Sequence, residues 1–157
     1  MSQTKQFLVK DYMHSKVVKV NDKASFKEAL EVMMAHKTNG IVVVHDDNRV
    51  AGILSSWDLI EHAVPDYLEE DKHLAAFESG DIFAERIKEV AEDKVTEFMS
   101  HHVHSIKAES TLMEASTLLS EFKIRQLPVV DDDGILIGYL NRTDIKNAMG
   151  EVLNLNK

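Results

Sequence analysis

The sequence predicts a mixed α/β fold made of two copies of one β-α-β-β-α unit. When the chain is shifted against itself by 86 residues, the segments 9–62 and 95–148 align without a gap. The residues of the first segment that recur unchanged are Val9, Met13, Val17, Glu28, Ala29, Lys37, Val43, Val44, Asp46, Asp47, Gly52, Leu54 and Asp58. Self-similarity at a fixed spacing indicates a duplicated structural unit. We therefore expect the function to depend on what the two copies do together.

The composition is that of an ordinary globular protein. A chain of 157 residues with 44% apolar residues can bury a substantial core, as one compact domain or two small subdomains. The absence of cysteine excludes disulfides and thiolate chemistry and fits a reducing compartment. The apolar runs are too short to span a membrane, and the polar start 1–5 does not resemble a secretory signal. We expect a cytoplasmic protein with no membrane partner.

The charge distribution singles out the middle of the chain. The net charge of −9 argues against binding to nucleic acid, which requires a basic surface. Ten acidic and four basic residues fall between positions 64 and 94, a segment with no counterpart in the repeat. We divide the chain into repeat 1 with its tail (1–63), an acidic, partly helical insert (64–94) and repeat 2 with its tail (95–157). The insert is either a solvated connector or a segment that docks a partner or covers a ligand.

The first half of repeat 1 predicts a turn, a strand and a helix. The apolar spacing of 9–13 favours a short helical turn, and 17–20 favours a short strand. Ser25 and Glu28 form a capping-box pattern ahead of an apolar stripe that ends near His36. We therefore expect a helix to begin at this pair.

The second half of repeat 1 predicts a hairpin and a closing helix. The β-branched run 40–44 is too continuous for a surface helix and indicates a buried strand. The turn residues that follow it lead into a return strand at 50–54. A helix over 56–63 closes the unit, because Pro65 stops it.

Repeat 2 predicts the same elements in the same order. We expect strands at 103–106, 127–130 and 135–140, and helices over 112–122 and 143–149.

Two further expectations concern segments outside the repeats. Phe7 and Leu8 are able to pack on the opposite repeat. The apolar spacing of 84–91 indicates an amphipathic helix in the insert, and we expect it to run on toward Met99.

Each repeat ends with a polar pair at the point where its last strand leads into a helix. The pairs are Ser55 with Asp58 and Asn141 with Asp144. Either pair is a good capping box, with the acidic residue at the third helical position. The same groups also suit a nucleotide, because free N–H groups at a helix start bind anions and a carboxylate accepts two hydrogen bonds from a ribose diol. Both interpretations remain open.

The motifs 127–131 (LPVVD) and 138–144 (GYLNRTD) resemble those of the cystathionine β-synthase (CBS) domain family. Over 9–63 and 95–149 the chain resembles a tandem CBS pair, or Bateman module. That resemblance implies two β-α-β-β-α units packed sheet to sheet, with an adenine nucleotide in the cleft between repeats. It also implies association of modules as flat dimers.

The family's helix-cap motif maps onto both repeats. Ser55 and Asp58 fit the pattern of a hydroxyl residue followed three positions later by aspartate. In repeat 2, Asp144 fits and Asn141 replaces the hydroxyl residue. The resemblance implies that the aspartates hold the ribose.

Other positions carry over unevenly. The first-strand position near the base is Ser105 in repeat 2 and Lys19 in repeat 1. A basic residue suited to phosphate is present as Arg125, whereas repeat 1 has Asn39. Arg142, just past the cap, is similarly placed, although both arginines also suit solvated helix-end positions.

The histidine cluster 101–104 invites a metal interpretation that we do not adopt. His102 and His104 share one face of a strand, but no carboxylate or cysteine stands at ligand spacing. We expect His104 to line the ligand cleft or meet solvent, and we expect no metal site.

We conclude from the sequence that the chain is a regulatory, non-catalytic module that senses an adenine nucleotide or adenosyl compound. The candidate ligands are AMP, ADP, ATP and S-adenosylmethionine, with no required cofactor. We expect a homodimer that signals through a conformational or dimer change, with a further protein partner left open. The alternative is a ligand-free dimerisation or adaptor module, which the substitutions at Asn141 and Lys19 favour. No nucleophile elbow, P-loop or metal cluster points to an enzyme.

Overall fold

The computed structural model describes residues 5–155, which form two compact units. We call residues 18–46 with 51–102 the first unit, and residues 5–17, 47–50 and 103–155 the second unit. Each unit is therefore built around one sequence repeat but includes the segment that precedes the first strand of the other repeat. None of the helices within residues 5–155 has the length and apolar character needed to cross a membrane.

The first unit contains a three-stranded sheet in the order β1-β2-β3. Its strands are β1 (Lys19–Asn21), β2 (Gly40–Val44) and β3 (Val50–Ser55). β1 and β2 are parallel, with Lys19 opposite Val42. Parallel neighbours need a crossover, and the predicted helix between them supplies it as α1 (Phe26–His36). The strand expected at 17–20 begins two residues later and ends one residue later than predicted.

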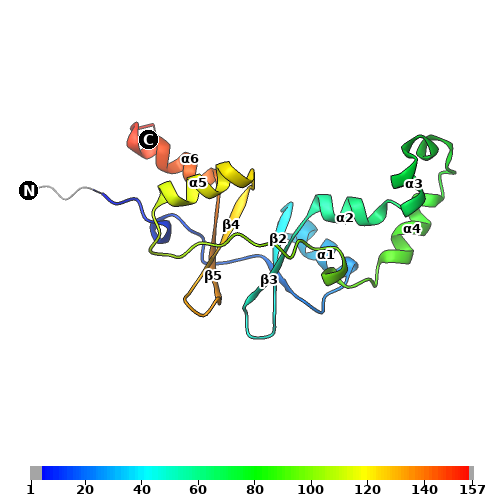
Figure 1. Cartoon of the computed structure of the whole chain (residues 1–157), viewed down its shortest axis with the longest axis horizontal. Helices are drawn as coiled ribbons and strands as arrows, with labels where there is room; N and C mark the ends of the chain where they lie inside the picture. Colours follow the sequence, from blue (N-terminus) through cyan, green and yellow to red (C-terminus); the bar gives the residue numbers. More distant parts are fainter. Residues whose placement is uncertain (1–4, 156–157) are drawn as a thin grey trace, which may run out of the picture. The chain divides into compact units, whose positions relative to one another are not determined.

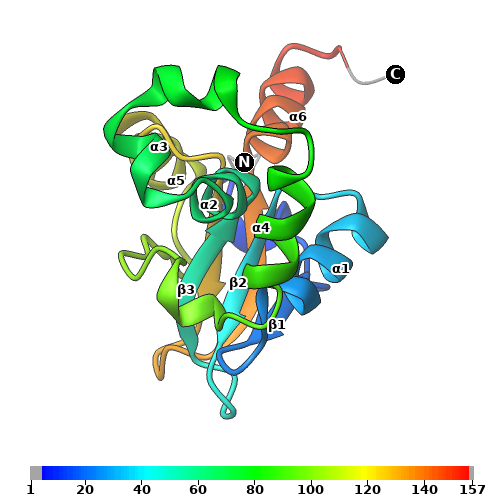
Figure 2. The ribbon, with the colours of Figure 1, turned by 90° about the vertical axis from the view of Figure 1, so that its right-hand side faces the viewer.

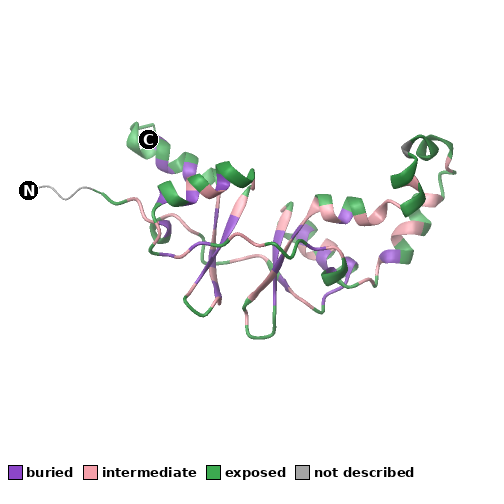
Figure 3. Ribbon diagram, viewed as in Figure 1, coloured by how far each residue is buried: buried purple, intermediate pink, exposed green. Residues whose placement is uncertain are grey.

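Three helices cover one face of this sheet (Figures 1 and 2). They are α1, α2 (Ser56–Ala63) and α4 (Ile82–Val90). The buried core between the helices and the sheet consists of Val20, Ala24, Phe26, Ala29, Met33, Ile41, Val43, Leu54, Leu59, Val90, Val95 and Met99. Figure 3 shows this buried class concentrated on the strands and on the inner sides of the helices. The apolar stripe predicted for α1 therefore faces the core, as expected.

The acidic insert is helical in pieces. It contains α3 (Asp66–Glu70), the 3-10 helix η2 (Lys72–Phe77) and α4, and a second 3-10 turn, η3 (Val95–Glu97), follows it. The expectation that the helix over 84–91 runs on toward Met99 is wrong, because α4 ends at Val90.

A turn follows α4, in which the N–H of Asp93 donates to the Val90 carbonyl at 2.9 Å. The backbone N–H groups of Phe26 and Lys27, in the first turn of α1, donate to the carbonyls of Asp93 and Ala91 at 2.8 and 2.9 Å. The first N–H groups of a helix have no partner within it and must find acceptors elsewhere. These contacts hold the segment after α4 against the start of α1 and so favour the turn over a longer helix.

The second unit contains a hairpin and two helices. Its elements are the 3-10 turn η1 (Val9–Asp11), α5 (Leu112–Phe122), β4 (Gln126–Val130), β5 (Leu136–Asn141) and α6 (Arg142–Val152). β4 and β5 are antiparallel, with Gln126 opposite Asn141. The buried core of this unit consists of Val9, Ile106, Ala108, Leu112, Ala115, Leu119, Leu127, Val129, Leu140, Ile145 and Ala148.

The strand expected at 103–106 is reduced to a single parallel bridge between Ile106 and Val129. In the first unit, the backbone N–H of Val42 donates to the carbonyl of Val18 at 3.2 Å. The residue at the corresponding repeat position is Pro128, which has no N–H to donate. One rung of the ladder is therefore missing in repeat 2, and the strand does not extend beyond the bridge.

The N-terminal segment packs on elements of repeat 2, as expected for Phe7 and Leu8. Leu8 bridges to Thr111, and the carbonyl of Phe7 accepts from the N–H of Leu112 at 2.8 Å. Val9 is fully buried in the core of the second unit. This exchange explains why the two spatial units differ in composition from the two sequence repeats.

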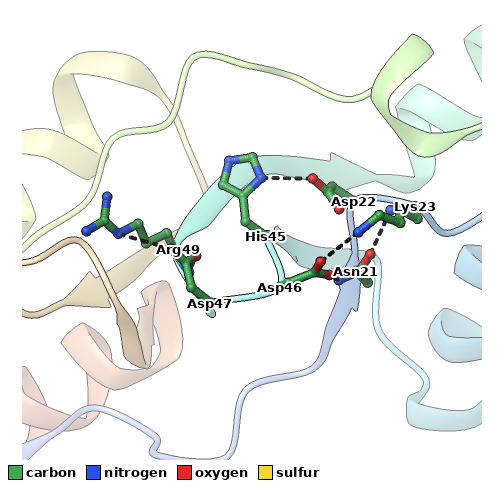
Figure 4. A network of polar contacts seen from close by, with 7 residues as sticks. All are labelled: Asn21, Asp22, Lys23, His45, Asp46, Asp47 and Arg49. Carbon is green, nitrogen blue, oxygen red and sulfur yellow. Dashed lines mark hydrogen bonds and ion pairs between the residues drawn. The ribbon is translucent and has the colours of Figure 1, made fainter.

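A polar network surrounds the ends of β1 and β2 in the first unit (Figure 4). Asp46 accepts from Asn21 at 2.8 Å and from Lys23 at 2.7 Å. His45 Nδ1 lies 2.8 Å from Asp22 Oδ2. These residues close the sheet at the end opposite to Ser55, so they leave the helix cap of α2 untouched.

Candidate functional site

The predicted cap of repeat 1 is present at the junction of β3 and α2. Ser55 is the N-cap, and its Oγ accepts from the Asp58 N–H at 3.3 Å. Asp58 Oδ2 accepts from both the N–H and the Oγ of Ser55, at 2.7 and 3.1 Å. Within residues 5–155, no donor contacts Asp58 Oδ1. One carboxylate oxygen therefore remains available to a ligand.

Asn39 lies beside this cap, and Lys19 stands at the same edge of the sheet. The Asn39 carbonyl accepts from Ser56 N–H at 2.9 Å, and Asn39 Oδ1 accepts from Ser56 Oγ at 3.1 Å. Lys19 is exposed at the start of β1, the neighbour of the strand that follows Asn39. Because the starts of β1 and β2 meet the end of β3, the structure gathers these four predicted residues at one edge.

The predicted cap of repeat 2 has the same backbone geometry. Asn141 Oδ1 accepts from the Asp144 N–H at 3.0 Å, and Asp144 Oδ2 accepts from the Asn141 N–H at 2.8 Å. Asparagine therefore replaces the hydroxyl residue without loss of the capping box. The Arg142 N–H donates to the Arg125 carbonyl at 3.1 Å, which repeats the contact between Ser56 and Asn39.

The two arginines bring positive charge to this cap. Arg125 precedes β4 and Arg142 opens α6, and both side chains are exposed. Among residues 5–155, neither forms a salt bridge with a carboxylate. A ligand phosphate near the start of α6 would therefore meet N–H groups of the helix together with two available cations.

Two further candidate residues, His104 and Ser105, lie in the segment before the bridge residue Ile106. The ring of His104 stacks on Phe122 at the end of α5, with centroids 3.7 Å apart. Ser105 is exposed directly before the bridge residue Ile106. His104 thus contacts the end of α5, and its expected role of lining the ligand cleft or meeting solvent stays a prediction.

Sequence reasoning missed the residue that contacts Asp144. His14 Nε2 lies 2.7 Å from Asp144 Oδ1, and the Asp144 side chain is only 6% exposed. The His14 ring also stacks on Tyr139, with centroids 4.8 Å apart. Burial, and to a smaller extent the Asp144 carboxylate, raises the pKa of Tyr139. Both carboxylate oxygens of Asp144 are therefore engaged.

The backbone holds His14 in this position. His14 and Tyr139 exchange two hydrogen bonds, N–H to carbonyl in each direction, at 2.9 Å. Gly138 permits the approach, because a Cβ there would lie 2.7 Å from the His14 carbonyl oxygen. The repeat alignment places Ser100 opposite His14 and therefore did not predict this contact.

Three potential metal ligands meet in the first unit, away from the histidines considered in the sequence. His62, Asp93 and Glu97 place ligand atoms within 4.8 Å of one another. His62 Nε2 already pairs with Asp93 Oδ2 at 2.8 Å, and the His62 ring stacks on Phe98. This contact ties α2 to the segment after α4. His101, by contrast, contacts the Thr96 carbonyl.

Comparison with known proteins matches both repeats to one family. The sequence profile of the CBS domain matches residues 9–64 and 95–151, which together make up well over half of the chain. An uncharacterized protein of Methanocaldococcus jannaschii is 28% identical over 155 residues, with 90% of each chain covered. A homoserine O-acetyltransferase of Methanocorpusculum labreanum is 26% identical over 145 residues; the match covers 92% of this chain and 24% of that enzyme.

Solved structures agree with the sequence comparison. A crystal structure of CBSX2 of Arabidopsis thaliana in complex with AMP is 28% identical, with a TM-score of 0.72 over 94% of this chain and 98% of that one. The mixed α/β fold and the tandem repeat predicted from the sequence are thereby confirmed.

Proposed function

The chain belongs to the CBS domain family as a tandem pair, and from that membership we propose that it is a regulatory module that binds an adenine nucleotide or a related adenosyl compound without chemical conversion. The observation that carries this proposal is the duplicated helix cap, in which an aspartate stands one turn into the helix that follows the last strand of each repeat. The AMP bound by CBSX2 supports AMP as the first ligand to test.

The caps suit a nucleoside phosphate for a chemical reason. An aspartate oxygen can accept from the 2′ and 3′ hydroxyls of ribose, which gives Asp58 and Asp144 the ribose role. The starts of α2 and α6 attract phosphate through the positive end of the helix dipole, and Arg125 and Arg142 add charge in repeat 2. Lys19, Asn39 and Ser105 complete the proposed set at the sheet edges. The candidate ligands are AMP, ADP, ATP and S-adenosylmethionine.

Signalling would follow from a population shift. A ligand that binds one conformation better than another favours it by the difference in binding free energy. The part that reads this change is proposed to be a dimer interface or a separate protein partner.

The surface of the first unit supports association with a second copy. Met34 on α1 and Trp57 and Ile60 on α2 are large apolar side chains that are each more than half exposed. Side chains of this kind are enriched in protein interfaces. The same surface serves the alternative function, a dimerisation or adaptor module whose helix caps bind no ligand.

Thermal unfolding against a ligand panel tests the proposal. AMP, ADP, ATP and S-adenosylmethionine are compared with GTP, and a ligand at a hundred times its Kd should add about 2.7 kcal/mol of stability. For the ligand that stabilises the chain, Asp58→Ala combined with Asp144→Ala should abolish the stabilisation. A shift that survives the double variant would refute the ribose role, and no shift with any adenosyl ligand at millimolar concentration would favour the adaptor.

A further inference from the structure

We propose that His14 makes the two caps unequal: it occupies Asp144 and leaves Asp58 as the preferred ribose anchor. This inference rests on the proposed binding of an adenosyl ligand and assigns its preferred repeat. The geometry of the two caps carries it, because they share one backbone arrangement and only the Asp144 carboxylate is in contact with a histidine.

Each oxygen of the Asp144 carboxylate already has a partner, and the side chain is only 6% exposed. Its Oδ2 accepts from the Asn141 N–H at 2.8 Å and its Oδ1 lies 2.7 Å from His14 Nε2. A ribose hydroxyl that approaches Oδ1 therefore competes with the imidazole. That imidazole is held by its stack on Tyr139 and by the paired backbone hydrogen bonds between the same two residues.

The first unit provides an internal comparison at the equivalent positions. Ser100 and Ile53 exchange two backbone hydrogen bonds at 2.9 and 3.0 Å, as His14 and Tyr139 do. The Ser100 hydroxyl donates to the His102 carbonyl at 3.3 Å. It forms no hydrogen bond with Asp58, whose Oδ1 has no donor among residues 5–155.

The close packing that creates this arrangement is also repeated. A Cβ on Gly52 would lie 2.7 Å from the Ser100 carbonyl oxygen, and one on Gly138 would lie 2.7 Å from the His14 carbonyl oxygen. The two crossing segments therefore approach their strands equally closely. The difference between the caps arises from the side chain at positions 14 and 100, rather than from the backbone.

The size of the effect follows from the contact that must be broken. A hydrogen bond to a charged group contributes about 1.5–3 kcal/mol, which corresponds to a penalty on binding at Asp144 of roughly 10- to 100-fold. His14 is half-exposed, so solvent reduces this penalty toward the lower end. Ligand should thus fill the cap at Asp58 at lower concentration than the cap at Asp144.

The experiment uses the full chain and measures AMP affinity by calorimetry, with folding of each variant checked by thermal unfolding. Asp58→Asn should weaken AMP binding strongly. In that background, His14→Ser should restore affinity by roughly 10-fold or more, because the repeat 2 cap then resembles the repeat 1 cap. Addition of Asp144→Asn should remove the restored binding.

Two matched variants distinguish a specific effect of the contact between His14 and Asp144 from a general effect of mutation. In the Asp58→Asn background, His14→Gln keeps an N–H donor near the position of Nε2 and should restore little affinity. In the otherwise unchanged chain, Ser100→His places an imidazole beside Asp58 and should weaken AMP binding by roughly 10-fold.

The outcomes distinguish this inference from the proposed function. If Asp58→Asn weakens binding and His14→Ser restores none, the chain binds AMP but His14 does not control the second cap, and the inference is overturned. If neither the unchanged chain nor the His14→Ser variant binds AMP or S-adenosylmethionine, the proposed function fails and this inference fails with it.

Discussion

Removal of the Asp144 carboxylate should destabilise the protein more than removal of its repeat partner Asp58. Asp144→Ala removes the acceptor for the Asn141 N–H, a capping loss of about 1 kcal/mol. It also removes the contact with His14, for which we expect about 1–2 kcal/mol because the carboxylate is buried and the imidazole half-exposed. Asp58→Ala loses the capping term only. The expected costs are therefore about 2–3 kcal/mol for Asp144 and about 1 kcal/mol for Asp58.

A double-mutant cycle isolates the part due to His14. Unfolding by urea gives the free energies of the unchanged chain, His14→Ala, Asp144→Ala and the double variant. The interaction free energy between positions 14 and 144 should be about 1–2 kcal/mol. The corresponding cycle between Ser100 and Asp58 should give a value near zero, because the Ser100 hydroxyl donates to the His102 carbonyl and not to Asp58.

Asp144→Asn serves as the control within this series. The amide oxygen of asparagine still accepts from the Asn141 N–H, so most of the capping term should survive. The contact between His14 and Asp144 would be shown to contribute no stability by two results together. These are equal destabilisation by Asp144→Ala and Asp58→Ala, and an interaction free energy near zero for the His14 cycle.

Three further predictions concern the same unit. Gly138→Ala should destabilise by about 1–3 kcal/mol in urea unfolding, because its Cβ would meet the His14 carbonyl oxygen at 2.7 Å. The pKa of Tyr139 is raised in the folded state, so stability should fall as the pH rises through 10, and Tyr139→Phe should flatten that fall. Lys5 and Tyr12 lower the pKa of Glu151, so the contribution of this carboxylate is lost as the pH falls, and Glu151→Gln should flatten the acid side of the stability profile.

Local signals explain what the sequence predicted well. A capping box spans three residues, so Ser55 with Asp58 and Asn141 with Asp144 could be recognised without knowledge of the tertiary structure. The duplication then supported the order of the elements, since the order in one sequence repeat predicts the order in the other. The predicted bounds of α1 and α2 agree with the structure because each helix begins at a local capping signal.

The wrong expectations arose where a local signal was ignored or where a distant contact decided the outcome. Pro128 could be recognised in the sequence as a residue without a backbone N–H to donate, and it shortens the first strand of repeat 2. The end of α4 was not visible in its own residues, because the segment that follows it turns and bonds to the start of α1. Sequence reasoning predicted the helix pattern and missed this tertiary contact.

The contact between His14 and Asp144 joins residues 130 positions apart, so no periodicity could reveal it. The contact forms because residues 5–17, which precede the first strand of repeat 1, pack on the elements of repeat 2. Duplication preserved the backbone of the two caps, whereas the residue that crosses each cap diverged to histidine in one and serine in the other. A symmetric scaffold with unequal crossing residues can give two sites of different affinity, and a sensor with two such sites would respond over a wider range of ligand concentration than one with identical sites.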